Sequence, residues 1–82
     1  MSKYRPLQDY LRRQNGQRVE LSFLEIERII GGELPPSAYA PRWWISAPSS
    51  RRHALWQNAW HNEGYVATLL QGADCVEFRK QL

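Results

Sequence analysis

Hydrophobic positions at the start of the chain recur first at helical and then at extended spacing. Tyr4, Leu7 and Leu11 repeat at the spacing of helical turns, which predicts a short amphipathic helix over residues 4–14. Residues 18–22 alternate polar and apolar side chains, which is typical of a brief strand. The chain is therefore expected to begin with a helix followed by a strand.

A second helix is predicted to begin directly after Ser22. Ser22 and Glu25 have capping-box spacing, in which the serine oxygen accepts a hydrogen bond from the N3 amide and the glutamate reaches back. The helix would bury a stripe of isoleucines and end at the glycine pair Gly31–Gly32. This is the clearest local signal in the chain, and it concerns folding rather than function.

The middle of the chain carries little periodicity. Two prolines make residues 34–36 extended or turn-like, and residues 37–40 can form one helical turn. Residues 42–45 include two adjacent tryptophans and an isoleucine, a β-like composition that predicts an extended segment. A loop over residues 47–50 ends in a serine that can cap the next helix.

The last part of the chain predicts one helix and a β-hairpin. The third helix spans residues 51–62. Residues 65–70 and 75–79 then predict two strands, joined by a turn over residues 71–74. The hairpin supplies the second and third strands of a small sheet.

This order predicts a single α+β domain over residues 1–82, with three short helices and a small antiparallel sheet that ends in a β-hairpin. The order fits a winged-helix arrangement, in which the short first strand joins the terminal hairpin. The connection from Gly31 to Ser50 is longer than a winged helix normally has. A compact α+β sandwich of another topology therefore stays open.

Composition narrows the class of protein. With 82 residues there is room for one domain, and four Trp, four Tyr and two Phe supply large groups for its core. The lone Cys75 excludes an internal disulfide and fits a reducing compartment. No N-terminal apolar run follows Met1, and no stretch approaches the roughly 18 apolar residues of a membrane span. We therefore expect a cytoplasmic protein with no membrane partner.

The distribution of charge says more than its net value of +3. Between Glu33 and Glu63 there is no acidic residue, while Arg42, Arg51 and Arg52 fall inside this stretch. One part of the fold should therefore be more positive than the rest, which permits an anionic partner.

The pair Trp43–Trp44 follows Arg42 directly. On a strand, adjacent side chains point to opposite faces, so one indole is expected in the core and the other at least partly accessible. An accessible indole beside an arginine can stack on a nucleic-acid base or anchor a protein interface. The alternative is that both indoles close the core of a small domain.

The start of the third helix offers a phosphate contact. Ser50, Arg51, Arg52 and His53 combine a hydroxyl, helix N-terminal amides and cationic groups. In a winged helix this would be the recognition helix, and Gln57 would read a base edge. Further phosphate contacts would come from Arg42 and Lys80. The alternative is an ordinary capped and solvated helix start.

A catalytic centre is hard to assemble from this sequence. His53 and His61, eight residues apart, are not a natural metal pair, and Cys75 at a strand start suits an inert role. No phosphate loop, dinucleotide fingerprint or zinc-hydrolase motif occurs. We expect no enzymatic activity, no metal and no cofactor.

Three motifs resemble those of a family of small bacterial and phage domains of uncharacterised function. They are S-F-x-x-I-E-x-I-I-G at residues 22–31, L-P-x-S-A at residues 34–38 and R-W-W at residues 42–44. The resemblance continues over nearly the whole chain. It implies one fold-sized unit and, for members from phages, a host-takeover or anti-defence role.

Two functions from different classes follow. The first is a nucleic-acid-binding module for DNA or RNA, with Arg42, Arg51, Arg52 and Lys80 on phosphate, Trp44 stacking and Gln57 on a base edge. The alternative is a protein-interaction domain, including an anti-CRISPR-like phage inhibitor of a host or defence protein, with the tryptophans as hot spot. A homodimer stays open, although no heptad pattern is present.

Overall fold

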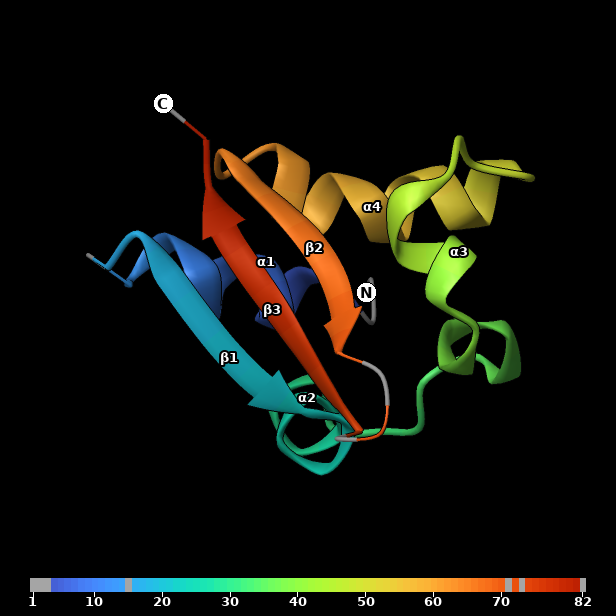
Figure 1. Ribbon diagram of the computed structural model, residues 1–82, viewed down its shortest axis with the longest axis horizontal. Helices are drawn as coiled ribbons and strands as arrows, with labels where there is room; N and C mark the ends of the chain where they lie inside the picture. Colours follow the sequence, from blue (N-terminus) through green and yellow to red (C-terminus); the bar gives the residue numbers. More distant parts are fainter. Residues whose placement is uncertain (1–3, 15, 71, 73, 82) are drawn as a thin grey trace.

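An antiparallel sheet of three strands forms one side of the fold. The computed structural model describes residues 4–14, 16–70, 72 and 74–81. The strands lie in the order β1-β3-β2, with bounds β1 (Arg18–Ser22), β2 (Tyr65–Leu70) and β3 (Cys75–Lys80). Both outer strands pair with β3, so that Val19 and Ala67 face Phe78 from its two sides. The first strand thus joins the terminal hairpin, as the sequence predicts (Figure 1).

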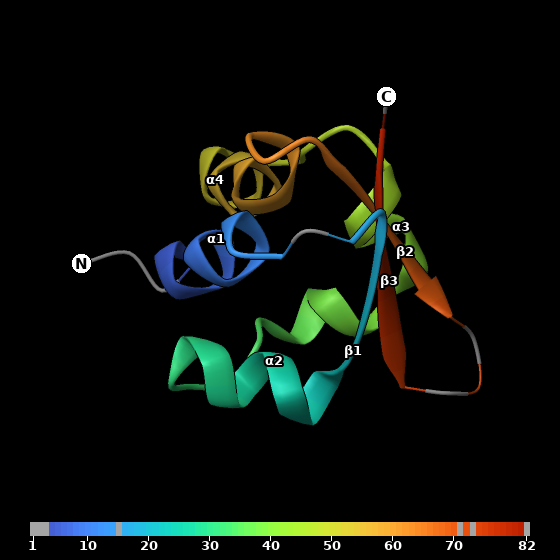
Figure 2. The ribbon, with the colours of Figure 1, turned by 90° about the vertical axis from the view of Figure 1, so that its left-hand side faces the viewer.

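Helices α1, α2 and α4 pack on one face of this sheet, as the edge-on view shows (Figure 2). The helical elements are α1 (Arg5–Arg12), α2 (Phe23–Ile30), the 3₁₀ helix η1 (Pro36–Tyr39), α3 (Pro41–Ile45) and α4 (Arg51–His61). The short helix α3 lies beside β2 (Figure 1). The α+β class is confirmed, with one helix more than the three predicted. The winged-helix interpretation stays a prediction.

The core lies between the sheet and the helices because the strands alternate. Leu21, Val76 and Phe78 point inward and are buried, while their neighbours along each strand point outward. Leu7 and Leu11 of α1 are buried against this layer, as are the inward side chains of α2 and α4. Amphipathic patterning therefore places α1, α2, α4 and the three strands as expected.

The predicted capping box at the start of α2 is present. Ser22 Oγ accepts a hydrogen bond from Glu25 N at 3.1 Å, and Glu25 Oε1 accepts one from Ser22 N at 3.0 Å. The helix ends at Gly31, whose φ of 70° is left-handed and favours glycine. The predicted helical turn after Pro35 is η1.

The segment Arg42–Ile45, predicted to be extended, is instead helix α3. Pro41 occupies its first turn, and Ser46 N donates to Arg42 O at 2.8 Å, an α-helical bond. The Trp44 indole Nε1 donates to Ala38 O at 2.7 Å in the interior. Burial of both indoles therefore overrides the β-like composition.

Two predicted turns fall partly outside the described residues. The residues of these turns that are not described are Asn15 in the expected helix stop and Gln71 and Ala73 in the expected hairpin turn. In the part of the turn that is described, Gly72 and Asp74 have φ of 80° and 48°. Among the helices described, none is long and apolar enough to cross a membrane.

Candidate functional site

The four tryptophans form one buried cluster. The exposed fractions of Trp43, Trp44, Trp56 and Trp60 are 7%, 1%, 4% and 0%. Ring centroids lie 4.8 Å apart for Trp43 and Trp44, and 5.0 Å apart for Trp44 and Trp60. The prediction of an accessible indole is therefore wrong, because successive helical positions in α3 turn both rings into the core. Neither Trp43 nor Trp44 can stack on a base or serve as an exposed anchor.

His53 is buried and joins α4 to α3. Its Nδ1 accepts a hydrogen bond from Ser49 N at 3.0 Å, so this nitrogen carries no proton. Nε2 then holds the ring proton and donates to Trp43 O at 2.6 Å. Both ring nitrogens are used within the protein, which corrects the assignment of His53 to a binding surface.

Gln57 lies one turn further along α4 and is also buried. Its Nε2 donates to Trp43 O at 3.2 Å and to Ser46 O at 2.8 Å. These carbonyls belong to the end of α3, where a helix leaves its acceptors without intrahelical partners. Gln57 therefore stabilises the end of α3, and the prediction that it reads a base edge is wrong.

Three predicted cationic residues remain on the surface. Arg42, Arg51 and Arg52 are exposed, and within the described residues none of them forms an ion pair. Arg12, by contrast, pairs with Glu63. Ser50 directly precedes Arg51 and Arg52, and its Oγ accepts from His53 N at 3.1 Å and caps α4.

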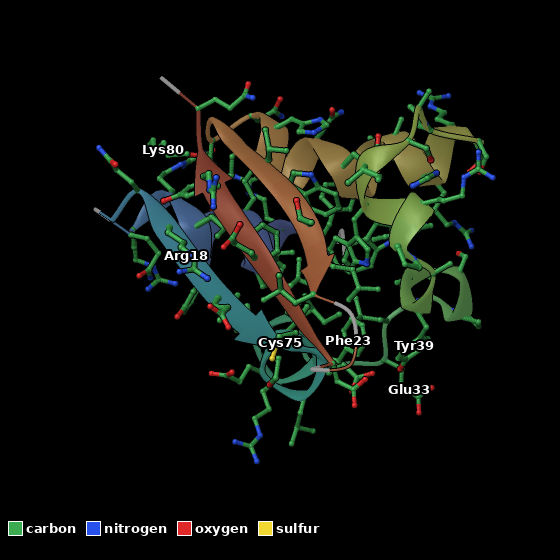
Figure 3. The ribbon with its side chains drawn as sticks, in the orientation of Figure 1. Arg18, Phe23, Glu33, Tyr39, Cys75 and Lys80 are labelled. Carbon is green, nitrogen blue, oxygen red and sulfur yellow. The ribbon has the colours of Figure 1, made fainter. Side chains whose placement is uncertain are left out.

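Lys80 lies elsewhere. Its ammonium is 5.2 Å from the centroid of the Tyr65 ring, and Tyr65 follows the C-terminal end of α4. Arg51 and Arg52 begin that helix, which at 11 residues is about 16 Å long. Figure 3 shows Lys80 at the opposite end of the fold from the start of α4. The predicted convergence of Lys80 with the arginines is therefore wrong.

A groove runs along the first half of α4. Its larger part has a volume of about 610 Å³ and is lined by Tyr4, residues 33–36, Arg52, Leu55 and Trp56. A smaller hollow of about 90 Å³ shares Pro35, Arg52 and Trp56 with it and adds three serines, Ser37, Ser49 and Ser50. We call the two together the α4 groove. Trp43 and His53 also line the smaller part, although both are buried.

Arg52 is the predicted site residue with the best position in this groove. It lines both parts and is exposed, so its guanidinium can reach whatever occupies either part. Glu33 is the acidic residue on the wall of the larger part. Tyr4, Glu33 and Leu55 also line the groove and were not predicted from the sequence. Only the 3.6-residue periodicity of α4, which places Leu55 beside the buried face, could have indicated one of them.

The outward face of the sheet is not the positive surface. Arg18 pairs with Glu20 at 2.9 Å and also with Glu77, and Arg79 pairs with Glu77 at 3.3 Å. Two positive and two negative side chains therefore balance each other there. Among the described residues, no group of three or more His, Cys, Asp or Glu side chains could hold a metal ion.

Comparison with known proteins identifies the family to which this chain belongs. No curated protein and no solved structure matches the chain. A family model does match, and it covers residues 4–81. The resemblance to an uncharacterised family is confirmed to that extent, while its sequence pattern and its bacterial or phage origin stay predictions. The chain belongs to the family described as Domain of unknown function (DUF7662).

Proposed function

We propose that this protein is a non-catalytic module that binds an extended segment of a partner polypeptide in the α4 groove. The supporting observation is the position of Arg52, a cation without an ion-pair partner among the described residues, at the junction of the two parts of the groove. Protein interfaces combine an apolar centre with a polar rim, and Arg is enriched in them.

The chemistry of the walls suggests what the partner segment carries. Leu55 and Tyr4 offer apolar contact in the larger part, and Pro35 lies against both parts. A carboxylate of the partner would lie against Arg52, where the serines of the smaller part can also donate hydrogen bonds. An inhibitor of a host or defence protein would be one such module, and that finer role rests on the family resemblance.

A pull-down with paired variants tests this proposal. Arg52→Glu and Leu55→Glu alter the groove, while Arg28→Glu and Leu24→Glu change the same residue types on the exposed side of α2. Proteins that wild type and both α2 variants retain, and both groove variants lose, support the proposal. Equal recovery by all four variants, with thermal melts close to wild type, would overturn it.

Nucleic acid is the second candidate, favoured by the exposed arginines Arg51 and Arg52 at the start of α4 and Arg42 in α3. The first turn of α4 has no acidic residue, and Ser50 caps it. Phosphate groups bind well at such a helix start. If the winged-helix interpretation is right, exposed Asn58 would face the bases instead of Gln57. Because all four indoles are buried, the protein would contact chiefly the phosphate groups, and binding would be largely independent of the nucleotide sequence.

Salt titration distinguishes this candidate. Binding to a mixed-sequence duplex is measured by fluorescence anisotropy at several salt concentrations. Removing two phosphate contacts with Arg51→Glu/Arg52→Glu should lower the slope of log K against log salt by about 1.8. The control Arg13→Glu/Arg28→Glu has the same charge change at the C-terminal cap of α1 and in α2. Equal slopes for the two double variants, or no binding at low salt, would reject the nucleic-acid candidate.

A further inference from the structure

A second hollow lies at the end of the fold where β2 and β3 are joined. It has a volume of about 230 Å³ and is lined by Phe23, Tyr39, Pro41, Leu69, Leu70 and Asp74, among others. We call it the hairpin pocket. Residues on its walls come from α2, η1, α3 and the hairpin, and none of them lines the α4 groove.

Two aromatic rings meet at this pocket nearly at right angles. The centroids of Phe23 and Tyr39 are 5.0 Å apart, with an interplanar angle of 79°. Tyr39 keeps 52% of its surface exposed, unlike the tryptophans of the core. Side chains of the pocket can thus present ring faces to a bound group, which the buried indoles cannot.

The surroundings of the pocket are acidic. Asp74 lies on its wall, and Figure 3 shows Glu33 beside Tyr39. Partial removal from water raises the pKa of Tyr39, and the nearby carboxylates of Glu27, Glu33 and Asp74 raise it further. Within the described residues none of these three carboxylates forms an ion pair. Glu27 already accepts a hydrogen bond from Leu34 N, so the negative charge available to a ligand is mainly that of Glu33 and Asp74.

We propose that the hairpin pocket binds a lysine side chain of a partner polypeptide. Charge complementarity supports a cation, since Asp74 lies on the pocket wall and Glu33 lies beside Tyr39, where both attract positive charge. The aromatic pair supports an ammonium group with an apolar stem, because cations are attracted to ring faces and the methylene chain packs against Leu69 and Leu70. An acidic rim without aromatic rings would attract positive charge alone and would not favour an apolar stem.

NMR titration with a small probe tests the pocket directly. Nα-acetyl-lysine methylamide at millimolar concentration should shift the amide resonances of Phe23, Tyr39 and Leu69. The norleucine analogue, which has the same stem without the charge, should shift them far less. Equal shifts from both probes, or no shift from the lysine probe, would overturn the proposal.

Variants refine the test. Tyr39→Leu and Asp74→Asn should each weaken binding of the lysine probe by about threefold, while Tyr39→Phe keeps the ring and should retain affinity. Asn tolerates the left-handed φ of 48° at position 74, so the fold should persist. Glu20→Gln on the sheet face is the matched charge control. If it weakens binding as much as Asp74→Asn, the attraction is unspecific and the pocket is not the site.

Failure of this proposal is separable from failure of the proposed function. Leu55→Glu alters the α4 groove alone and should leave the lysine-probe shifts unchanged. Tyr39→Leu should likewise leave capture by the α4 groove intact if the two sites bind independently.

Discussion

The imidazole of His53 stacks on the indole of Trp43 and also donates a hydrogen bond to the backbone carbonyl of that residue. The ring centroids lie 4.9 Å apart with an interplanar angle of 14°, and the Nε2 to O distance is 2.6 Å. Because Nδ1 accepts from Ser49 N, one side chain fastens α3, the loop and the start of α4 together. Stability, rather than ligand binding, should therefore depend on His53.

Replacement of His53 by Ala should destabilise the fold by about 2–4 kcal/mol. The change removes buried ring contacts and leaves the part-buried Ser49 amide without its acceptor, and both losses lower the free energy of unfolding. Urea unfolding measures the loss. His61→Ala is the matched control, since His61 is exposed on the same helix and should cost less than about 0.5 kcal/mol. Similar losses for both variants would contradict the role assigned to His53.

Trp44→Ala should cost about 3–5 kcal/mol, because it removes a fully buried indole. A small domain has a total stability of about 5–15 kcal/mol, so the variant should melt far below wild type or fail to fold. Tyr39→Ala, which removes a half-exposed ring, should cost much less. An unchanged melt for Trp44→Ala would show that the indole is not a core group and would revive its role as a surface anchor.

Ser22→Ala should destabilise the protein by about 1 kcal/mol, because the capping box loses its acceptor for Glu25 N. Ser50→Ala removes the corresponding acceptor for His53 N and should cost a similar amount. Chemical denaturation of both variants checks this. Ser37→Ala provides the comparison, since it changes an exposed serine that caps no helix. Equal stability of Ser22→Ala and Ser37→Ala would contradict the capping contribution.

Glu63 should make stability depend on pH. Hydrogen bonds from Arg12 and Gln8 hold the pKa of Glu63 below its ordinary value. The folded state thus favours the ionised form, and its contribution is present above the ordinary carboxyl pKa of about 4.3. It is lost as the pH falls through the lowered value. Glu63→Gln should therefore lower the urea midpoint at neutral pH and approach wild type in acid.

The control for this experiment is Glu33→Gln, which removes an exposed carboxylate that forms no ion pair among the described residues. Its urea midpoint should follow that of wild type across the pH range. If the urea midpoints of Glu63→Gln and wild type still differ at the lowest pH tested, then the shape of the Glu63 side chain, and not its charge, links α1 to the end of α4.

The candidate site was predictable only in its charges. That one part of the fold would be richer in Arg42, Arg51 and Arg52 could be predicted, because the acid-free stretch is a property of the chain itself. The α4 groove was not predictable, because Pro35 and Leu55 reach it from distant parts of the sequence. The two prolines indicate an extended segment but not which helix it lies against.

Local periodicity and turn chemistry by themselves determined α1, α2 and α4, the three strands and the capping box, since these depend on residues close together in the chain. Only the tertiary structure decided that all four indoles are buried. It also decided that His53 and Gln57 hydrogen-bond to carbonyl groups at the end of α3. A helical α3 turned Trp43 and Trp44 inward and left carbonyl groups that buried polar side chains of α4 had to satisfy. The spacing of residues in the sequence does not indicate which distant carbonyl group a buried side-chain amide will bond to.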